Sequence, residues 1–279
     1  PEGSIDLSVG NPIDPTPDVI QKALDAASNS PGYPTTWGDV AARQAVASWC
    51  GRRRRTPGLT SDQVLLTIGS KEFISWLPIM LGLGAGDVVV QPTLAYTAYE
   101  VGAKFAGAEI FVGDDPALWP DTTKLIWLNS PGNPNGSVHS IEFLRAAVTR
   151  ARELGAVIVN DECYAEMGWI EPWGEYIPCI LDPEITGGDV NNILSIYSLS
   201  KQSNLAGYRA AFAAGDEKLI KGLVNLRMHS GMMVPMPVQK AMVAALSDDD
   251  HVQKQKEIYR RRRAILKPAL EKAGFQIVD

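Results

Sequence analysis

The chain of 279 residues contains 45% hydrophobic and 21% charged residues and has a formal net charge of -6 at neutral pH. This length is enough for one large domain or two moderate ones, and the composition is that of a folded globular chain, not of a disordered one. The negative charge argues against nucleic acid as the main partner, because phosphate binding depends on a surplus of Lys and Arg. Two arginine runs, at 52–55 and 260–263, are interpreted as solvated faces.

The three cysteines, Cys50, Cys163 and Cys179, are irregularly spaced and form no CxxC pair. The sequence therefore predicts neither a disulfide framework nor a metal site. No apolar run is as long as a bilayer span and no signal peptide is visible, so we expect a cytoplasmic protein without a membrane partner. Because the chain begins at Pro1 and stops inside the strand-like stretch GFQIVD, we expect residues to be missing at both ends.

Short apolar runs alternate with amphipathic segments through the middle of the chain. We expect strands at 63–69, 87–92, 109–113, 124–131, 156–162 and 192–198, and helices at 70–84, 96–108 and 140–154. This alternation predicts an α/β fold with a mostly parallel sheet covered by helices on both faces. From about residue 248 the chain is a long, charged, helix-like stretch that we expect to open a second, smaller domain.

Polar clusters follow several of the expected strands. They comprise Gly69-Ser70-Lys71, residues 129–133, Asp161-Glu162 and residues 198–201. Ligands of parallel sheets bind at the carboxyl ends of the strands, so these clusters predict one shared site.

The stretch GSKE at 69–72 joins an expected strand to an expected helix and is a candidate phosphate site. Its backbone N–H groups and the Ser70 hydroxyl could hold an anion at the positive end of the helix. Ser198, Ser200 and Arg209 could add two hydroxyls and a bidentate guanidinium. A helix N-cap is the alternative role of Ser70, and the P-loop pattern GxxxxGK[ST] is absent.

Lys201 lies in SIYSLSKQSNLAGYR, just after an apolar strand. Most lysines in such a place are surface residues, but a lysine whose amine attacks a carbonyl needs a lowered pKa. Around it, Asp161 could hold a protonated ring nitrogen, Tyr164 and Asn133 could reach a phenolic oxygen, and Tyr96 could stack on a ring. These demands together match pyridoxal phosphate, with Lys201 as the imine lysine.

The motifs resemble those of the class I/II aminotransferases of pyridoxal-phosphate fold type I. The lysine motif is SLSKQSNLAGYR, the asparagine motif NSPGNPNG and the acidic motif DECY, with GSKE and a tyrosine-rich stretch in the same order as in the family. These motifs lie between about residue 7 and residue 237. The resemblance implies a large cofactor domain at 31–247, an N-terminal arm at 1–30, and the start of a small C-terminal domain at 248–279.

The resemblance also implies a role for each matching residue. Lys201 is the Schiff-base lysine and proton shuttle, Asp161 the partner of the pyridine nitrogen, and Tyr164 with Asn133 the donors to the 3-oxygen. Tyr96 is the stacking aromatic, which the spacing favours over Tyr99. The phosphate contacts are Ser70, Lys71, Ser198, Ser200 and Arg209, and Gly10 and Asn133 contact the substrate. Tyr33 reaches the phosphate of a neighbouring subunit, which implies a homodimer with shared active sites.

Two features depart from the family pattern. The asparagine motif has PN where the family has PT, and the arginine that binds the substrate α-carboxylate is expected beyond residue 279. Within the family the motifs are most similar to actinobacterial N-succinyldiaminopimelate aminotransferases, which implies 2-oxoglutarate as the second substrate. Other reactions with the same cofactor stay open, namely transamination of aspartate or aromatic amino acids and carbon–sulfur β-elimination, as does a non-catalytic regulatory domain. Met232 and Met233 are either pocket or core residues, and we expect His229 to pack.

Overall fold

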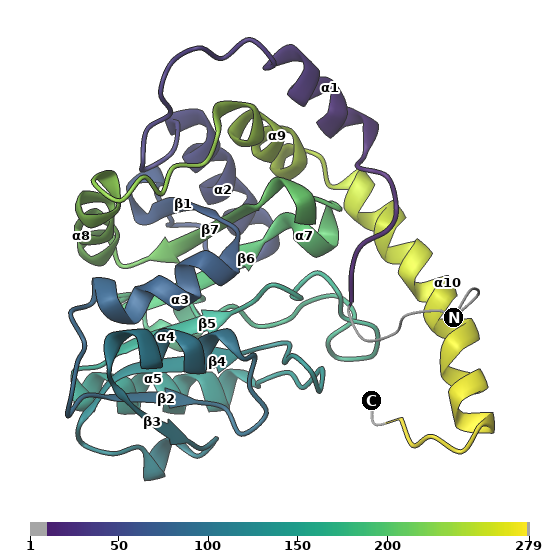
Figure 1. Cartoon of the computed structure of the whole chain (residues 1–279). Helices are drawn as coiled ribbons and strands as arrows, with labels where there is room; N and C mark the ends of the chain where they lie inside the picture. The colour runs from purple at the N-terminus through teal and green to yellow at the C-terminus, as the bar shows by residue number, and fades with distance from the viewer. Residues whose placement is uncertain (1–9, 278–279) are drawn as a thin grey trace, which may run out of the picture.

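The fold is built on one seven-stranded sheet, seen in a computed structural model that describes residues 10–277 (Figure 1). The strand order is β1-β7-β6-β5-β4-β2-β3. Strand β7 is antiparallel to both of its neighbours, and the remaining pairs are parallel. The strands are β1 (Val64–Ile68), β2 (Val88–Gln91), β3 (Glu109–Val112), β4 (Thr123–Asn129), β5 (Val157–Asp161), β6 (Ile193–Ser198) and β7 (Ala210–Gly215).

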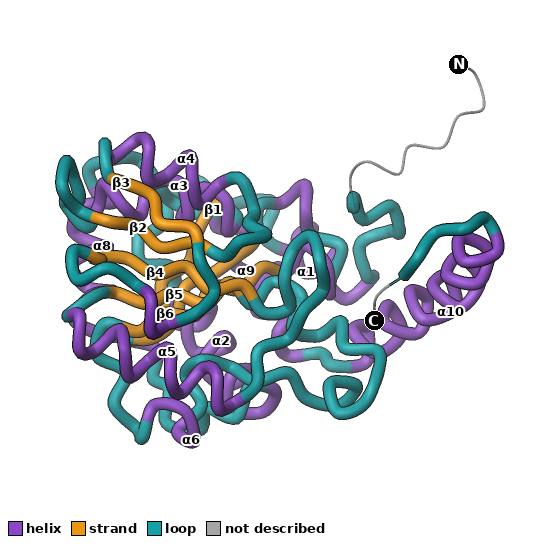
Figure 2. Tube along the Cα trace, turned by 90° about the horizontal axis from the view of Figure 1, so that it is seen from below, coloured by secondary structure: helices purple, strands orange, loops and turns teal. Residues whose placement is uncertain are grey.

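Helices cover both faces of the sheet, so that it is the middle layer of three (Figure 2). The α-helices of the described residues are α1 (Asp18–Ala26), α2 (Val40–Arg53), α3 (Ser70–Met80), α4 (Ala98–Ala106), α5 (Ile141–Leu154), α6 (Pro183–Thr186), α7 (Leu199–Gln202), α8 (Glu217–Met228), α9 (Met236–Ser247) and α10 (Asp250–Lys272). Single 3₁₀ turns occur at Ser61–Gln63, Pro116–Leu118 and Ala206–Tyr208.

Alternate residues of each strand face two separate hydrophobic clusters. Leu65 of β1 and Trp127 of β4 pack with α3, α4 and α8, whereas Leu66 and Ile126 pack with α2, α5 and α9. This period of two is the pattern of a strand buried on both faces. The helix predicted from residue 140 is confirmed as α5, and Ser140 caps it by accepting a 3.2 Å hydrogen bond from the Phe143 N–H.

The six predicted strands are confirmed as β1 to β6, but β7 was not predicted. Its sequence is AAFAAG, in which only Phe212 is large. Alanine and glycine are poor strand formers in isolation, so residues 210–215 lack a local signal. The strand forms because its small side chains fit, fully buried, between β1 and β6.

Helix α10 extends away from the compact body of the molecule, whereas α1 packs against α9 of that body (Figure 1). Ile20 of α1 is fully buried in the core that α9 also lines. The domain limits at 30 and 247 stay predictions. Within the described residues, no helix is both long enough and apolar enough to cross a membrane.

Candidate active site

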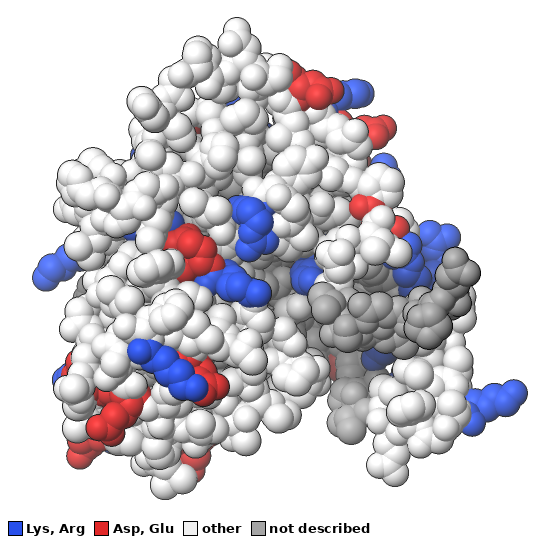
Figure 3. All heavy atoms as spheres, viewed as in Figure 1, with Lys and Arg blue, Asp and Glu red and all other residues white. Residues whose placement is uncertain are grey.

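The residues predicted from the strand ends do meet at one edge of the sheet. Asp161 ends β5, and Ser198 ends the neighbouring strand β6, directly before α7 and Lys201. Gly69 follows β1, and Arg209 precedes the antiparallel strand β7, which brings these two residues to the same edge. The Gly69 N–H donates a 2.8 Å hydrogen bond to the Arg209 carbonyl. Basic side chains gather around a hollow in the middle of this face, between the sheet and α10 (Figure 3).

Gly69, Ser70, Ser198, Ser200 and Arg209 lie at this edge and make up a candidate phosphate cup. Gly69 has a φ of +75°, and a Cβ added there would lie 2.1 Å from Nη2 of Arg209, so only glycine lets the guanidinium approach the chain. The Ser198 and Ser200 hydroxyls are 2.8 Å apart, and the exposed Arg209 donates from Nη1 to the Ala206 carbonyl at 2.9 Å. Ser70 opens α3, whose N-terminal N–H groups favour an anion.

Asp161 is buried and its oxygens accept hydrogen bonds from the protein. The Tyr99 hydroxyl donates to Oδ2 at 3.0 Å and the Cys163 N–H donates to Oδ1 at 3.2 Å. Burial raises the pKa of Asp161, and hydrogen bonds from the side chain and N–H of Cys163 and from the Tyr99 hydroxyl oppose the rise. Asp161 takes part in none of the ion pairs formed among residues 10–277. A buried carboxylate without a protein cation fits a protonated ring nitrogen, and thus the pyridine ring of pyridoxal phosphate.

Tyr99 is the residue of this site that sequence reasoning passed over. It is fully buried on α4, and its ring stacks on Trp127 of β4 with centroids 5.1 Å apart. Tyr99 lies in the first turn of α4, whereas Tyr96 precedes the helix. Tyr96 is half-buried and meets Tyr99 edge to face at 6.0 Å, so its ring remains available for stacking.

Lys201 lies on the single turn of α7, half-buried. Its Nζ is 5.8 Å from the centroid of the Tyr164 ring and donates a hydrogen bond to the Gly10 carbonyl. Burial lowers the pKa of the Lys201 amine, and Cys163 opposes this. A lowered pKa increases the neutral fraction of the amine, which is the form that reacts with an aldehyde.

Tyr164 and Asn133 come from the two loops that flank this edge. Burial raises the pKa of Tyr164 to about 12, so its hydroxyl keeps its proton and can donate it in a hydrogen bond. The N–H of Asn133 donates to Oδ1 of Asn129 at 2.7 Å, and Nδ2 of Asn129 donates to the Asp161 carbonyl at 2.9 Å. Asn129 belongs to a polar cluster predicted at the site, without a role of its own, and it ties the asparagine loop to the end of β5.

Other predicted residues lie apart from this cluster or only at its rim. Lys71 is exposed, with Nζ 5.6 Å from the centroid of the Tyr96 ring. Tyr33 is 97% exposed and does not reach the cup of its own chain. His229 is exposed, so the expectation that it packs was wrong, while Met232 and Met233 are half-buried.

The interpretation of residues 52–55 as a solvated face holds for Arg52 and Arg55, which are exposed, but was wrong for Arg54. Arg54 is 2% exposed and its Nη2 donates to Oε2 of the buried Glu162 at 2.8 Å. The other oxygen of Glu162 accepts hydrogen bonds from Nδ2 of Asn160 and the N–H of Ile180. Glu162 is thus a structural carboxylate beside the site carboxylate Asp161. The charge of Arg54 is stabilised by a partner more than a hundred residues away, which the local pattern cannot reveal.

Comparisons with known proteins agree with this geometry. The family model "Aminotransferase class I and II" matches residues 2–279. A probable aminotransferase of Mycobacterium tuberculosis is 48% identical over 99% of this chain and 66% of its own length. The 4-dedimethylamino-4-oxo-anhydrotetracycline transaminase OxyQ of Streptomyces rimosus is 49% identical over 99% of this chain and 76% of its own. The LL-diaminopimelate aminotransferase of Aquifex aeolicus is 34% identical over 98% of this chain and 73% of its own length.

The fold agrees with solved structures as well. The crystal structure of an aminotransferase from Neisseria meningitidis matches with a TM-score of 0.88 and 32% identity, over 98% of this chain and 73% of that one. The chain therefore spans about two thirds to three quarters of the length of these proteins. By its family match, its relatives and its fold, the chain belongs to the class I and II aminotransferases, the pyridoxal-phosphate-dependent transaminases of fold type I.

Proposed function

We propose that the chain forms most of an enzyme that moves an amino group between an amino acid and a 2-oxo acid. The observation that carries this proposal is the meeting of a buried, cation-free carboxylate, Asp161, and a half-buried amine, Lys201, at one edge of the sheet. When bound, pyridoxal phosphate supplies an aldehyde that condenses with amines and an electron-poor ring that takes up the electrons of a broken bond.

The residues of this edge would hold the ring and polarise it. Asp161 would accept a hydrogen bond from the ring nitrogen and keep that nitrogen protonated, while Tyr164 and Asn133 would donate to the ring 3-oxygen. Tyr96 would stack on the ring. The phosphate cup would bind the phosphate through hydroxyls, helix N–H groups and the Arg209 guanidinium, with Lys71 nearby.

Lys201 carries the proton transfers. When free and neutral, its Nζ would accept the proton of the substrate α-carbon as a general base, and the resulting ammonium group would give that proton back as a general acid. The lowered pKa of Lys201 favours this role, because a neutral amine is the base and its protonated form is the acid. Gly10, whose carbonyl accepts a hydrogen bond from Nζ, would meet the substrate next to this amine.

We propose N-succinyldiaminopimelate and 2-oxoglutarate as one side of a reversible amino transfer, in a lysine-forming pathway of the cytoplasm. The motif resemblance supports this choice, and so do relatives named for LL-diaminopimelate. The relative of Streptomyces rimosus acts by its name on a tetracycline precursor, so the donor has to be established by experiment.

We further propose a homodimer in which Tyr33 reaches the phosphate cup of the partner. The 97% exposure of Tyr33 supports this, since a tyrosine with a function in its own chain would be packed there. Exposed Trp76, Ile79 and Phe105 on α3 and α4 offer apolar surface for such an interface. The test mixes a Lys201→Ala variant with a Tyr33→Ala variant. A dimer with shared sites regains one intact site per mixed pair, whereas independent monomers regain none.

The reaction is tested by incubating the cofactor-loaded protein with 2-oxoglutarate and single amino donors, and measuring glutamate. N-succinyldiaminopimelate, LL-diaminopimelate, aspartate and cystathionine form the donor panel. The proposal predicts glutamate with the first donor, no glutamate with Lys201→Ala, and normal turnover with Lys254→Ala, which removes an exposed lysine of α10. Pyruvate from cystathionine without glutamate from any donor would contradict transamination.

A further inference from the structure

One polar face of α10 contacts two chain segments that meet at Lys201, namely the residues that follow α7 and residues 10–16. The side chains of this face are His251, Gln255, Tyr259 and Arg262, spaced three or four residues apart and therefore on one side of the helix. They contact Ser203 and Asn204, which follow α7, and Asp14, which lies four residues after Gly10.

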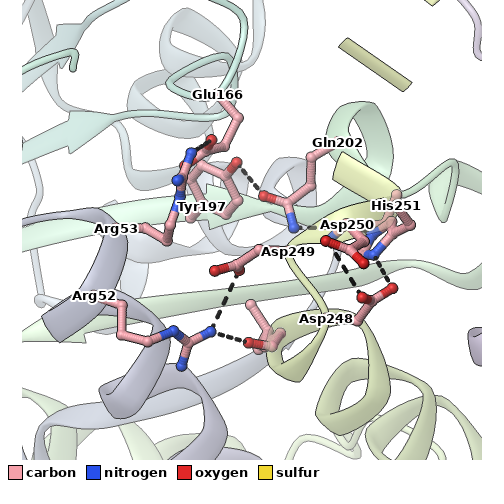
Figure 4. Close-up of polar contacts among 11 residues, drawn as sticks. Arg52, Arg53, Glu166, Tyr197, Gln202, Asp248, Asp249, Asp250 and His251 are labelled. Atoms are coloured by element: carbon pink, nitrogen blue, oxygen red, sulfur yellow. Dashed lines mark hydrogen bonds and ion pairs between the residues drawn. The ribbon is translucent and has the colours of Figure 1, made fainter. Parts of the chain in front are cut away.

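His251 fixes the segment after Lys201. Its Nε2 lies 2.8 Å from the Ser203 hydroxyl and its Nδ1 lies 3.1 Å from Oδ2 of Asp248 (Figure 4). The order Ser-His-Asp has the composition of a hydrolase triad, but Ser203 is fully buried, so no substrate reaches it. The chain of hydrogen bonds continues instead through Gln202, whose Oε1 accepts from the Tyr197 hydroxyl at 2.6 Å. These contacts hold α7 to the start of α10.

Gln255 joins the two segments directly. Its Oε1 accepts a 2.9 Å hydrogen bond from Nδ2 of Asn204, and its Nε2 donates to Oδ2 of Asp14 at 2.8 Å. The side chain is 5% exposed, so loss of either bond would leave a buried amide group unpaired. Nδ2 of Asn204 also donates to the Pro15 carbonyl at 3.3 Å.

Asp14 receives a second contact from the same helix face. Nη1 and Nη2 of Arg262 donate to its two oxygens at 2.7 and 2.6 Å, a bidentate ion pair. The Arg262 hydrogen bonds lower the pKa of Asp14 against the effect of burial, so the carboxylate stays charged. Segment 10–16 is thereby tied to α10 at one end and contacts the Lys201 amine through Gly10 at the other.

On the basis of the proposed function, we propose that Gln255 and Asp14 are positioning residues for Lys201. They hold segment 10–16 across the lysine, so that α10 sets how deeply the amine is covered and which carbonyl it faces. Neither side chain touches the reacting atoms. The groups that face Nζ are the Gly10 carbonyl, the Tyr164 ring and Cys163.

The test measures the rate at which Lys201 condenses with added pyridoxal phosphate, a reaction that releases one water. The rate is monitored by visible absorbance at a series of pH values, which gives a pH profile with a midpoint. Release of segment 10–16 uncovers the amine and returns its pKa toward the ordinary lysine value, since burial is the main cause of the lowering. The midpoint of the profile for Asp14→Asn and for Gln255→Leu should therefore rise toward that of an exposed lysine, which slows capture at neutral pH because less of the amine is neutral.

Two further variants separate positioning from general stability. Gln255→Glu places a carboxylate against Asp14, and adding Asp14→Asn restores a donor–acceptor pair. The profile of the double variant should therefore return toward that of the wild type. Glu257→Gln removes one negative charge from an exposed position of α10, where Glu257 pairs with Arg260, and should leave the midpoint unchanged.

The outcomes are distinct. If the wild type captures the cofactor and the variants lower the melting temperature without moving the midpoint, the positioning role is overturned, and Asp14→Asn decides this even if Gln255→Leu does not fold. If the wild type itself gives no visible band, the proposed function fails, and this inference with it. The positioning role is supported if the midpoint rises in Asp14→Asn and in Gln255→Leu, and returns toward the wild-type value in the double variant with Gln255→Glu and Asp14→Asn.

Discussion

The Tyr99 hydroxyl donates a 3.0 Å hydrogen bond to Oδ2 of Asp161, in a fully buried contact between α4 and the end of β5. The stacking of Tyr99 on Trp127 holds the ring in place, so this hydroxyl approaches the carboxylate from a fixed direction. Tyr99 therefore orients Asp161 toward the ring nitrogen that the carboxylate is proposed to bind.

Tyr99→Phe tests this relationship. The ring and its stacking remain, but Asp161 loses a donor, and a buried acceptor without its partner costs about 1–3 kcal/mol of unfolding free energy. We also expect kcat to fall about tenfold, since Asp161 is held less well. Tyr96→Phe is the matched control, because it also removes one hydroxyl and keeps the ring face. Equal losses in the two variants would contradict the role given to Tyr99.

Asp161→Asn and Glu162→Gln compare two adjacent buried carboxylates. Burial raises the pKa of Asp161, so its charged form destabilises the cofactor-free protein, and its contribution to stability is lost as pH rises from the ordinary Asp range through the raised value. Asp161→Asn should therefore keep or increase the melting temperature without cofactor at neutral pH, yet abolish the gain on adding pyridoxal phosphate.

Glu162→Gln should do the reverse. It leaves Arg54 charged and buried without its carboxylate, at a cost of about 3–5 kcal/mol of unfolding free energy. The cofactor-induced rise in melting temperature should persist in the fraction that folds. Thermal denaturation with and without cofactor measures both variants, and a normal cofactor response of Asp161→Asn would refute the role of Asp161.

Gly69→Ala tests the phosphate cup. Gly69 has a φ of +75° and a ψ of 159°, a conformation open almost only to glycine, so alanine there carries about 1–3 kcal/mol of backbone strain, and its Cβ would collide with the Arg209 guanidinium. Gly107→Ala also places alanine at a positive φ, +71° with a ψ of 19°, but with no atom within 4 Å of the new Cβ. Both variants should lose stability, Gly69→Ala the more, but only Gly69→Ala should bind pyridoxal phosphate at least tenfold more weakly by fluorescence titration. Equal affinities would mean that Arg209 does not bind the phosphate.

The sequence predicted the elements that carry strong local patterns. The six apolar strands and the capped helix α5 are confirmed. In each of these elements, the hydrophobic residues and the residues that mark its ends lie close together in the sequence, so the local pattern is enough to predict it. Strand β7 escaped prediction because its alanines are stabilised only by their neighbours in the sheet. The position of Arg209 at the shared edge follows from that strand, so its structural basis could not be derived locally either.

The site shows the same division. Asp161, Ser198 and Lys201 follow strands and could be located from the rule for parallel sheets. The roles of Tyr99, Asn129 and Gln255 depend on hydrogen bonds to residues that are distant in the chain or belong to another element. A polar residue on a helix gives no sign in the sequence of whether its partner is water or a buried carboxylate.

The role of Lys201 is tested most directly by identifying the lysine that binds the cofactor. The protein is incubated with pyridoxal phosphate, the carbon–nitrogen bond is reduced with borohydride, and the labelled peptide is located by mass spectrometry. We expect a label on Lys201 and a visible absorption band that Lys201→Ala lacks. A label on another lysine, or an unchanged band in Lys201→Ala, would show that Lys201 does not bind the cofactor.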